Sequence, residues 1–164
     1  MNATTPPHPT DAAPWLLIDL GNTRLKWALA SGPRLVCEPE ALDVDPEGLP
    51  WASWREMDPV GIALASVAPA GVSDAITEAM TARLGKAVFT ARTRSSWRGL
   101  HCGYPRSERL GVDRWLSLIA VYQHDPECAA VVVSAGTALT VDRLDPHGRH
   151  RGGVIAPGLT AMRN

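Results

Sequence analysis

The sequence predicts an α/β protein made of two related halves, and two observations carry this prediction. First, an apolar run with a glycine break at residues 16–27 is followed by a second segment of the same form at residues 131–141. Second, the remaining strand-type runs alternate with segments of helical periodicity, an order that is typical of mixed α/β sandwiches. The sequence ends before the second half repeats the helices of the first, so we expect an incomplete second half and a chain that is a fragment.

The first half is predicted to follow the order β-β-β-α-β-α-β. Strands are expected at residues 15–19, 25–30, 36–38, 60–67 and 87–90, and helices at residues 46–57 and 73–84. The Gly21-Asn22 pair predicts a hairpin turn between the first two strands. Ser73 is expected to cap the second helix at its N-terminus, and Gly85 is expected to stop it.

The second half is predicted to begin with a connection at residues 93–107 and a helix at residues 110–122. Strands are then expected at residues 129–134, 139–144 and 152–155, and a further helix is expected to start at Pro157-Gly158-Leu159. We therefore divide the chain into a disordered lead-in at residues 1–14, a first domain at residues 15–106 and a second domain at residues 107–164.

Composition excludes several classes of function. The 164 residues carry a net charge of −1, which gives no general attraction to nucleic acid or to a membrane surface. No apolar run approaches the roughly 20 residues that span a bilayer. The three cysteines are widely spaced and the histidines lack metal-ligand spacing, so we expect a cytoplasmic protein with reduced thiols, and we expect His147 and His150 to be solvated. The tryptophans Trp15, Trp27, Trp51, Trp54 and Trp115 are expected in the core.

The two glycine breaks suggest a phosphate-bearing ligand. Glycine allows the backbone to approach a phosphate closely, and the N–H groups of such a turn can bind its oxygens. One break in each half favours a ligand gripped between the halves, and ATP in particular.

Four short motifs occur in a distinctive order: Asp19-x-Gly21-Asn22-Thr23-x-x-Lys26, Gly111-x-Asp113-Arg114-Trp115, Gly136-Thr137-Ala138 and Gly152-Gly153-x-Ile155-x-Pro157-Gly158. From residue 15 onward the chain resembles the type III pantothenate kinases and their Bvg accessory factor relatives, within the acetate/sugar kinase–Hsp70–actin superfamily. The resemblance implies duplicated actin-like (ribonuclease H-like) domains that close on ATP, phosphorylation of pantothenate to 4'-phosphopantothenate, and a homodimer.

The resemblance also implies an ATP site at the first motif. Its members are Asp19, Leu20, Gly21, Asn22, Thr23, Arg24, Leu25 and Lys26, and Thr137 of the third motif joins them. The turn amides would hold the phosphates, Lys26 would balance their charge, and Asp19 would act near Mg²⁺ and its waters. The alternative for this motif alone is an ordinary Gly-Asn hairpin with an exposed lysine.

The second motif implies the substrate site. Asp113 is expected to accept the proton of the pantothenate hydroxyl, and Tyr104, Gly111, Val112 and Arg114 are expected to contact the substrate with it. Asp113 also suits a first helical turn without any chemistry, because the helix dipole favours an acid there. Pro105 directly follows Tyr104, a departure from the family pattern, and a tyrosine half-buried at a domain seam is the alternative for Tyr104.

Ser134 stands where many members of the family have an aspartate that serves a monovalent cation such as K⁺ or NH₄⁺. A hydroxyl binds a cation more weakly than a carboxylate does, so we expect no potassium site at this position. Asp142 lies nearby in the sequence and is expected to have no more than a strand-end role.

Other functions remain open on the sequence alone. One is a non-catalytic regulatory or accessory protein on the same scaffold, which would bind ATP without turnover. A second is a kinase of the superfamily that acts on another small alcohol, and a third is an inactive fragment that folds poorly.

Overall fold

The computed structural model describes residues 13–158 and Met162. The chain divides into two compact units, Met1–Ala91 and Arg92–Asn164. This division falls before the boundary expected between residues 106 and 107, because the intervening segment bonds within the second unit: Thr93 Oγ1 donates to the Leu110 carbonyl at 2.7 Å, and the His101 amide donates to the Gly148 carbonyl at 2.7 Å. The lead-in expected at residues 1–14 lies, up to residue 12, outside the described residues.

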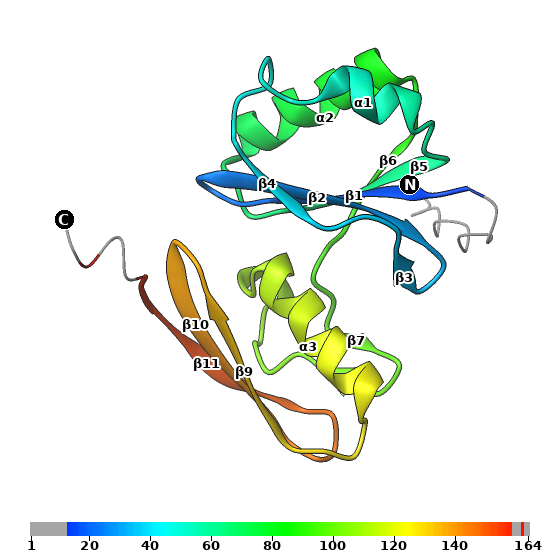
Figure 1. Ribbon diagram of the computed structural model, residues 1–164. Coiled ribbons are helices and arrows are strands. Elements are labelled where there is room, and N and C mark those ends of the chain that lie inside the picture. Colours follow the sequence, from blue (N-terminus) through cyan, green and yellow to red (C-terminus); the bar gives the residue numbers. More distant parts are fainter. Residues whose placement is uncertain (1–12, 159–161, 163–164) are drawn as a thin grey trace. The chain divides into compact units, whose positions relative to one another are not determined.

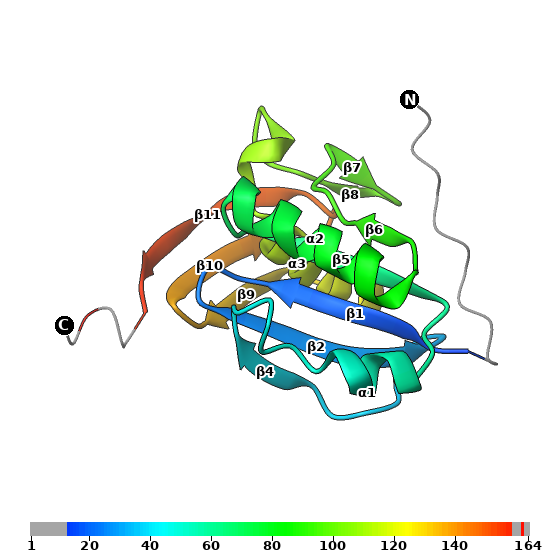
Figure 2. The same cartoon turned by 90° about the horizontal axis from the view of Figure 1, so that it is seen from above.

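The first unit contains a six-stranded mixed sheet (Figure 1). Its strands are β1 (Trp15–Leu20), β2 (Arg24–Ser31), β3 (Arg34–Leu35), β4 (Glu40–Asp43), β5 (Gly61–Ser66) and β6 (Val88–Thr90). The order is β3-β2-β1-β5-β6, with β1 and β2 antiparallel and with β5 parallel to both β1 and β6. Strand β4 pairs with β2 beside β3, so that β2 lies between β1 and β4 (Figure 2).

Two helices, α1 (Trp51–Glu56) and α2 (Ala70–Leu84), cover one face of this sheet (Figure 1). Alternate residues of the strands meet them: β1 buries Leu16, Ile18 and Leu20, and β5 buries Ile62 and Leu64. The same core includes Trp27, Trp51 and Trp54, whose rings pack edge to face. The expected burial of the tryptophans is confirmed for these three and for Trp15 and Trp115. Asp19 and Lys26 occupy the intervening positions of β1 and β2, so they lie on the other face of the sheet.

Three local predictions in this unit are wrong. Residues 36–38 form no strand, because Val36 and Cys37 end β3 by bonding back to Leu29 through the Val36 amide and the Cys37 sulfur. The helix expected at residues 46–57 begins only at Trp51, since Pro46 and Pro50 interrupt its first turns. Helix α2 begins at Ala70 after Pro69, which leaves Ser73 inside the first turn rather than at the cap, whereas the stop at Gly85 is confirmed by its left-handed φ of 64°.

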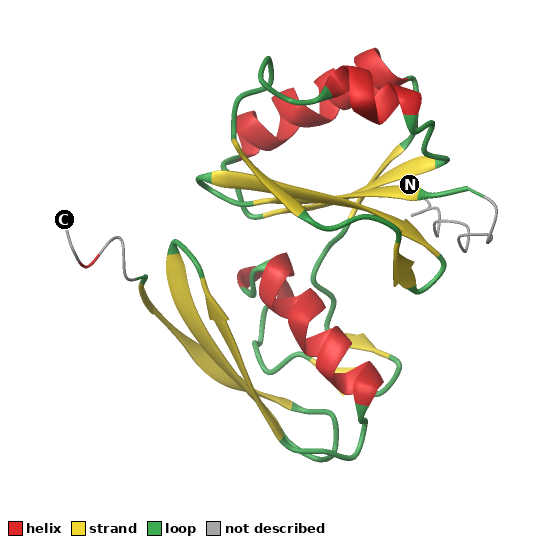
Figure 3. Cartoon of the chain, viewed as in Figure 1, coloured by secondary structure: helices red, strands yellow, loops and turns green. Residues whose placement is uncertain are grey.

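The second unit places one long helix on an antiparallel sheet (Figure 3). Its elements are β7 (Ser96–Trp97), β8 (Leu100–His101), the 3₁₀ turn η1 (Ser107–Arg109), α3 (Val112–His124), β9 (Ala130–Ala135), β10 (Ala138–Leu144) and β11 (His150–Pro157). The sheet order is β11-β10-β9. Trp115 and Leu118 of α3 pack with Leu100, Leu110 and Leu144 in a separate core.

The prediction that residues 93–107 form only a connection is wrong, because they contain the β7–β8 hairpin and the first residue of η1. Arg98 and Gly99 both have positive φ, 45° and 97°, which is the backbone of a tight two-residue hairpin turn. The further helix expected from Pro157-Gly158-Leu159 does not begin there, because Pro157 is the last residue of β11 and Gly158 is not helical; Leu159 lies outside the described residues. The predicted mixed α/β class is confirmed, and no helix in the described part of the chain is long and apolar enough to cross a membrane.

Candidate active site

The β1–β2 turn of the first unit carries the first sequence motif. The Gly21 amide donates to the Arg24 carbonyl at 3.0 Å, and a Cβ on Gly21 would lie 3.2 Å from that oxygen, so glycine closes the turn tightly. Asn22, Thr23 and Arg24 are exposed at its tip. The Gly21 N–H is therefore used within the turn, and the exposed tip is the part that is open to a ligand.

The eight residues of this motif do not present their side chains alike. Leu20 and Leu25 are fully buried in the core, so only their backbone can contact a ligand. Asp19 and Lys26 are cross-strand partners, and Lys26 Nζ lies 3.3 Å from Asp19 Oδ2. These two side chains are 45% and 60% exposed, so the pair adds little to stability, and each group remains available to another partner.

The β9–β10 turn of the second unit has a similar construction. The Gly136 amide donates to the Ala138 carbonyl at 3.0 Å across the turn. In the first unit, the Gly21 amide donates to the Arg24 carbonyl in a similar way. The Gly158 amide donates to the Thr137 carbonyl at 3.0 Å, and a Cβ on Gly158 would meet the Gly136 and Thr137 backbone. Gly158 thus holds the end of β11 against the turn. The Thr137 residue predicted to contact ATP is exposed.

The start of α3 carries the second motif. Gly111 caps the helix, and its carbonyl accepts the first helical hydrogen bond from the Trp115 amide at 3.0 Å. Val112 is buried, which seats the first turn on the core. Asp113 is exposed, and its carboxylate has no hydrogen-bond or ion-pair partner among the described residues.

Arg114, the next residue, lies in a different environment. It is 5% exposed and binds Asp142 of β10 through two hydrogen bonds, Nε to Oδ2 at 2.8 Å and Nη2 to Oδ1 at 2.6 Å. The hydrogen bond to Asp142 raises the pKa of the Arg114 guanidinium above its ordinary range, against the lowering effect of burial. Both the ordinary and the raised pKa lie far above neutral, so this stabilisation is present in full throughout the physiological pH range.

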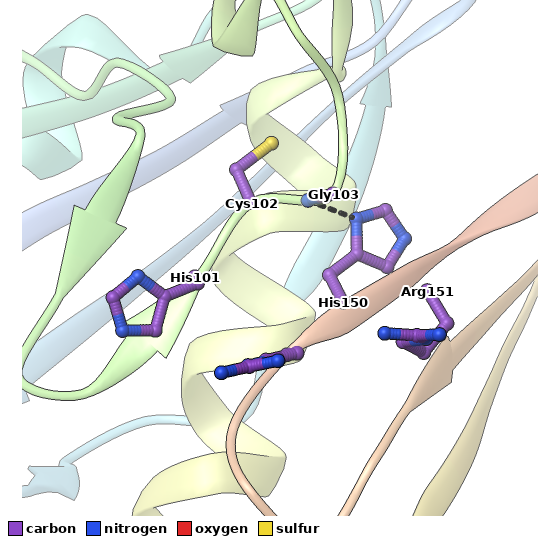
Figure 4. A pocket seen from close by; sticks show the side chains of 6 residues that line it. His101, Cys102, Gly103, His150 and Arg151 are labelled. Carbon is purple, nitrogen blue, oxygen red and sulfur yellow. Dashed lines mark hydrogen bonds between the residues drawn. The ribbon is translucent and has the colours of Figure 1, made fainter.

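His150 of β11 completes this buried network. Its Nε2 lies 2.8 Å from Asp142 Oδ1, and the Gly103 amide points to its Nδ1 at 3.5 Å (Figure 4). Since Nδ1 faces an N–H donor, the proton of a neutral ring belongs on Nε2, where it can donate to Asp142. The Tyr104 ring stacks on His150 with a centroid separation of 5.7 Å. Arg114 Nη2 lies 3.5 Å from the Tyr104 hydroxyl.

The structure therefore brings two of the predicted residues together, since Tyr104 contacts Arg114 beside the start of α3. It corrects two predictions: Asp142 and His150 are each 2% exposed, so Asp142 has more than a strand-end role and His150 is not solvated. A signal for Asp142 did exist in the sequence. It alternates with Thr140 and Leu144 on the inward side of β10, where a carboxylate requires a buried partner.

A cavity of about 500 Å³ lies beside this network (Figure 4). Its lining residues are His101, Cys102, Gly103, Arg149, His150 and Arg151. Arg149 immediately precedes β11 and Arg151 is the second residue of this strand, so the two arginines flank His150 along the chain. Two arginines thus line the cavity together with the imidazole of the network.

The described residues contain no group of three or more histidine, cysteine, aspartate or glutamate side chains that could hold a metal ion. Asp19 can supply one carboxylate, which suits Mg²⁺ held mainly by nucleotide phosphates and water. Ser134 pairs with Thr140 across β9 and β10, so this register position carries two hydroxyls and no carboxylate.

The sequence profile of the family described as type III pantothenate kinase matches residues 15–164. The chain belongs to this family. It is 37% identical to the type III pantothenate kinase of Burkholderia vietnamiensis over 155 residues, which cover 92% of this chain and 58% of that protein. It is 41% identical to the type III pantothenate kinase of Laribacter hongkongensis over 150 residues, which cover 91% of this chain and 60% of that protein. The chain thus spans about three fifths of the length of these relatives.

Solved structures support the fold of this member of the type III pantothenate kinase family. One is described as a Baf family transcriptional activator from Campylobacter jejuni, with a TM-score of 0.51, 19% identity, and coverage of 88% of this chain and 55% of that one. Another is an exopolyphosphatase-like protein, with a TM-score of 0.50, 13% identity, and coverage of 94% and 54%. At these identities the likeness concerns the fold alone.

Proposed function

We propose that this chain transfers the γ-phosphoryl group of ATP to the primary hydroxyl of pantothenate, giving 4'-phosphopantothenate for coenzyme A synthesis. Membership of the type III pantothenate kinase family supports the reaction. The observation that carries the assignment in this chain is the Asp113 carboxylate, which is exposed and unpartnered in the described structure, next to the buried and anchored Arg114. A base must be accessible to its substrate and rigidly placed, and this sequence of two residues provides both properties.

Asp113 accepts the proton of the pantothenate hydroxyl as the oxygen bonds to the γ-phosphorus and the bond to the ADP oxygen breaks. Tyr104, Gly111 and Val112 contribute to the substrate pocket through one ring and the backbone that leads into α3. The role of Arg114 is narrower than the motif suggests. Asp142 compensates its charge, so it acts mainly by holding the pocket in place.

The residues Asp19 to Lys26 and Thr137 hold the nucleotide. The exposed tip of the β1–β2 turn and Thr137 contact phosphate oxygens. Lys26 gives up its ion pair with Asp19 and balances the phosphate charge instead. Asp19 is then free to bind a water of Mg²⁺ that accompanies ATP. That ion, when bound, neutralises charge on the transferred phosphoryl group. We propose that potassium is not required, because Ser134 supplies only a hydroxyl.

The test is pantothenate-dependent ADP release by the purified chain with ATP and magnesium, in the presence and in the absence of potassium. Release that requires pantothenate and not potassium supports the proposal. ATP binding without release favours an accessory protein, and release with a different alcohol in a substrate panel favours another kinase activity. The family resemblance also supports a cytoplasmic homodimer, and light scattering on the purified chain measures its mass.

A further inference from the structure

The Asp142 carboxylate is buried and accepts three hydrogen bonds from two side chains. Oδ2 accepts from Arg114 Nε, and Oδ1 accepts from both Arg114 Nη2 and His150 Nε2. The side chain is 3% exposed, so neither a substrate nor a metal ion reaches it. Its influence on a reaction must therefore act through the groups that it holds.

Those groups lead directly to the proposed substrate pocket. Arg114 is bonded through the backbone to Asp113, so anchoring its guanidinium on β10 restrains the first turn of α3. His150 presents the flat face of its ring to Tyr104, at an interplanar angle of 19°. The Arg114 guanidinium also lies over the Tyr104 ring, at 5.9 Å from its centroid. Tyr104 is thus held by both donors to Asp142.

Two glycines leave room for this arrangement. A Cβ on Gly153, which is the cross-strand partner of Asp142, would lie 2.6 Å from Arg114 Nη2 and would also meet Asp142 Oδ1. A Cβ on Gly103 would meet the His150 backbone carbonyl. Backbone from two different segments therefore approaches the network closely, and a side chain at either glycine would displace it.

We infer that Asp142 and His150 are positioning residues, which aim Tyr104 and the first turn of α3 through Arg114. This inference rests on the proposed function for its consequence in catalysis, but its structural content is independent of activity. Pro105 directly follows Tyr104 in the loop, and the Tyr104 ring contacts both His150 and Arg114.

The decisive variant is His150→Gln, because it removes the ring under Tyr104 and keeps the Arg114–Asp142 pair. We expect the KM for pantothenate to rise about tenfold, while kcat and the KM for ATP change less than about twofold. A merely structural role would lower the amount of folded enzyme and hence the apparent kcat, with no change in KM. Asp125→Asn is the matched control, because Asp125 is exposed in the same unit and its carboxylate bonds only the Glu127 amide among the described residues.

The second measurement is amide hydrogen exchange by mass spectrometry, which does not depend on turnover. In His150→Gln and in Asp142→Asn, we expect exchange at residues 103–116 to accelerate about tenfold or more, with β1 and β2 unchanged. Asp125→Asn should leave both regions as in the parent. If the parent chain releases no ADP, the proposed function fails for this chain, and exchange alone decides the positioning role. Unchanged exchange at residues 103–116 in His150→Gln overturns the inference.

Discussion

Gly153 lies so close to Arg114 that a Cβ on this glycine would come within 2.6 Å of the guanidinium Nη2. The same atom would meet the Asp142 carboxylate, to which Arg114 is bonded. The second residue of the Gly152-Gly153 pair is therefore glycine for a packing reason, because a larger side chain there would clash with the buried Arg114–Asp142 ion pair. A buried pair of this kind is sensitive to any displacement of one partner, since the other charge is then left uncompensated.

Gly153→Ala is accordingly expected to destabilise the chain by about 2–3 kcal/mol, the range of an overpacked buried site. Thermal or urea unfolding monitored by circular dichroism measures this loss. Gly71→Ala is the matched control: Gly71 is exposed in the first turn of α2, and its Cβ would meet nothing within 4 Å. That substitution should stabilise the chain by roughly 0.5 kcal/mol, because alanine favours a helix over glycine. Equal effects of the two substitutions would contradict the packing argument.

Asp113→Asn is expected to leave the unfolding temperature within a few degrees of the parent, because the side chain is exposed and has no partner among the described residues. Loss of a proton acceptor should lower kcat about 100-fold or more. The measurement is pantothenate-dependent ADP release at saturating ATP. Near-normal turnover would refute the role of Asp113, and Asp125→Asn should remain active in the same assay.

Lys26→Met separates phosphate binding from stability. The Lys26–Asp19 pair is exposed, so its removal should change the free energy of unfolding by less than about 0.5 kcal/mol. The KM for ATP should rise about tenfold, because a cation beside the phosphates is lost. Lys86→Met is the control, since Lys86 forms a comparable surface pair with Asp58 at 2.7 Å. A similar rise in KM for both variants would remove Lys26 from the nucleotide site.

The Asp145 carboxylate stabilises the turn between β10 and β11, and this contribution to stability depends on pH. The backbone N–H of Arg149, and then that of His147, bond its carboxylate and hold its pKa below the ordinary value of 3.8. A lowered pKa gives stability that is present above the ordinary value and is lost as the pH falls through the lowered one. Asp145→Asn should therefore be less stable than the parent at about pH 6, with the difference shrinking as the pH falls below the ordinary pKa of 3.8. A difference that is independent of pH would contradict this origin.

Most elements were predictable because local patterns encode them. Strands β1, β2, β5 and β6 and helix α3 lie within a few residues of the apolar runs that predicted them. Two of the errors fall where a non-local contact overrode a local pattern. Residues 36–38 bond to the neighbouring strand instead of extending β3, and residues 92–106 join the second unit through contacts to Leu110 and Gly148.

The residues of the candidate site also fall into two groups, those that local patterns indicate and those that only the tertiary structure places. Asp113 and Tyr104 were predicted from motifs whose residues are near neighbours in the chain, and those roles stay predictions. The importance of Asp142 and His150 was missed, because the alternation of Thr140, Asp142 and Leu144 indicates the inward side of β10 but not the partners that a buried carboxylate finds there. Asp142 is 28 positions from Arg114, and only the packing of β10 against α3 brings them into contact.

The sequence by itself determined the α/β class, the two glycine-closed hairpins and the family, since each depends on residue order over short stretches. Only the tertiary structure decided which charges are buried and which are open to a ligand. It assigned Arg114 to Asp142 and left Asp113 accessible, although the two residues are adjacent in one motif. The physical reason is helical geometry: successive residues of α3 point about 100° apart, so one faces the sheet and its neighbour faces solvent.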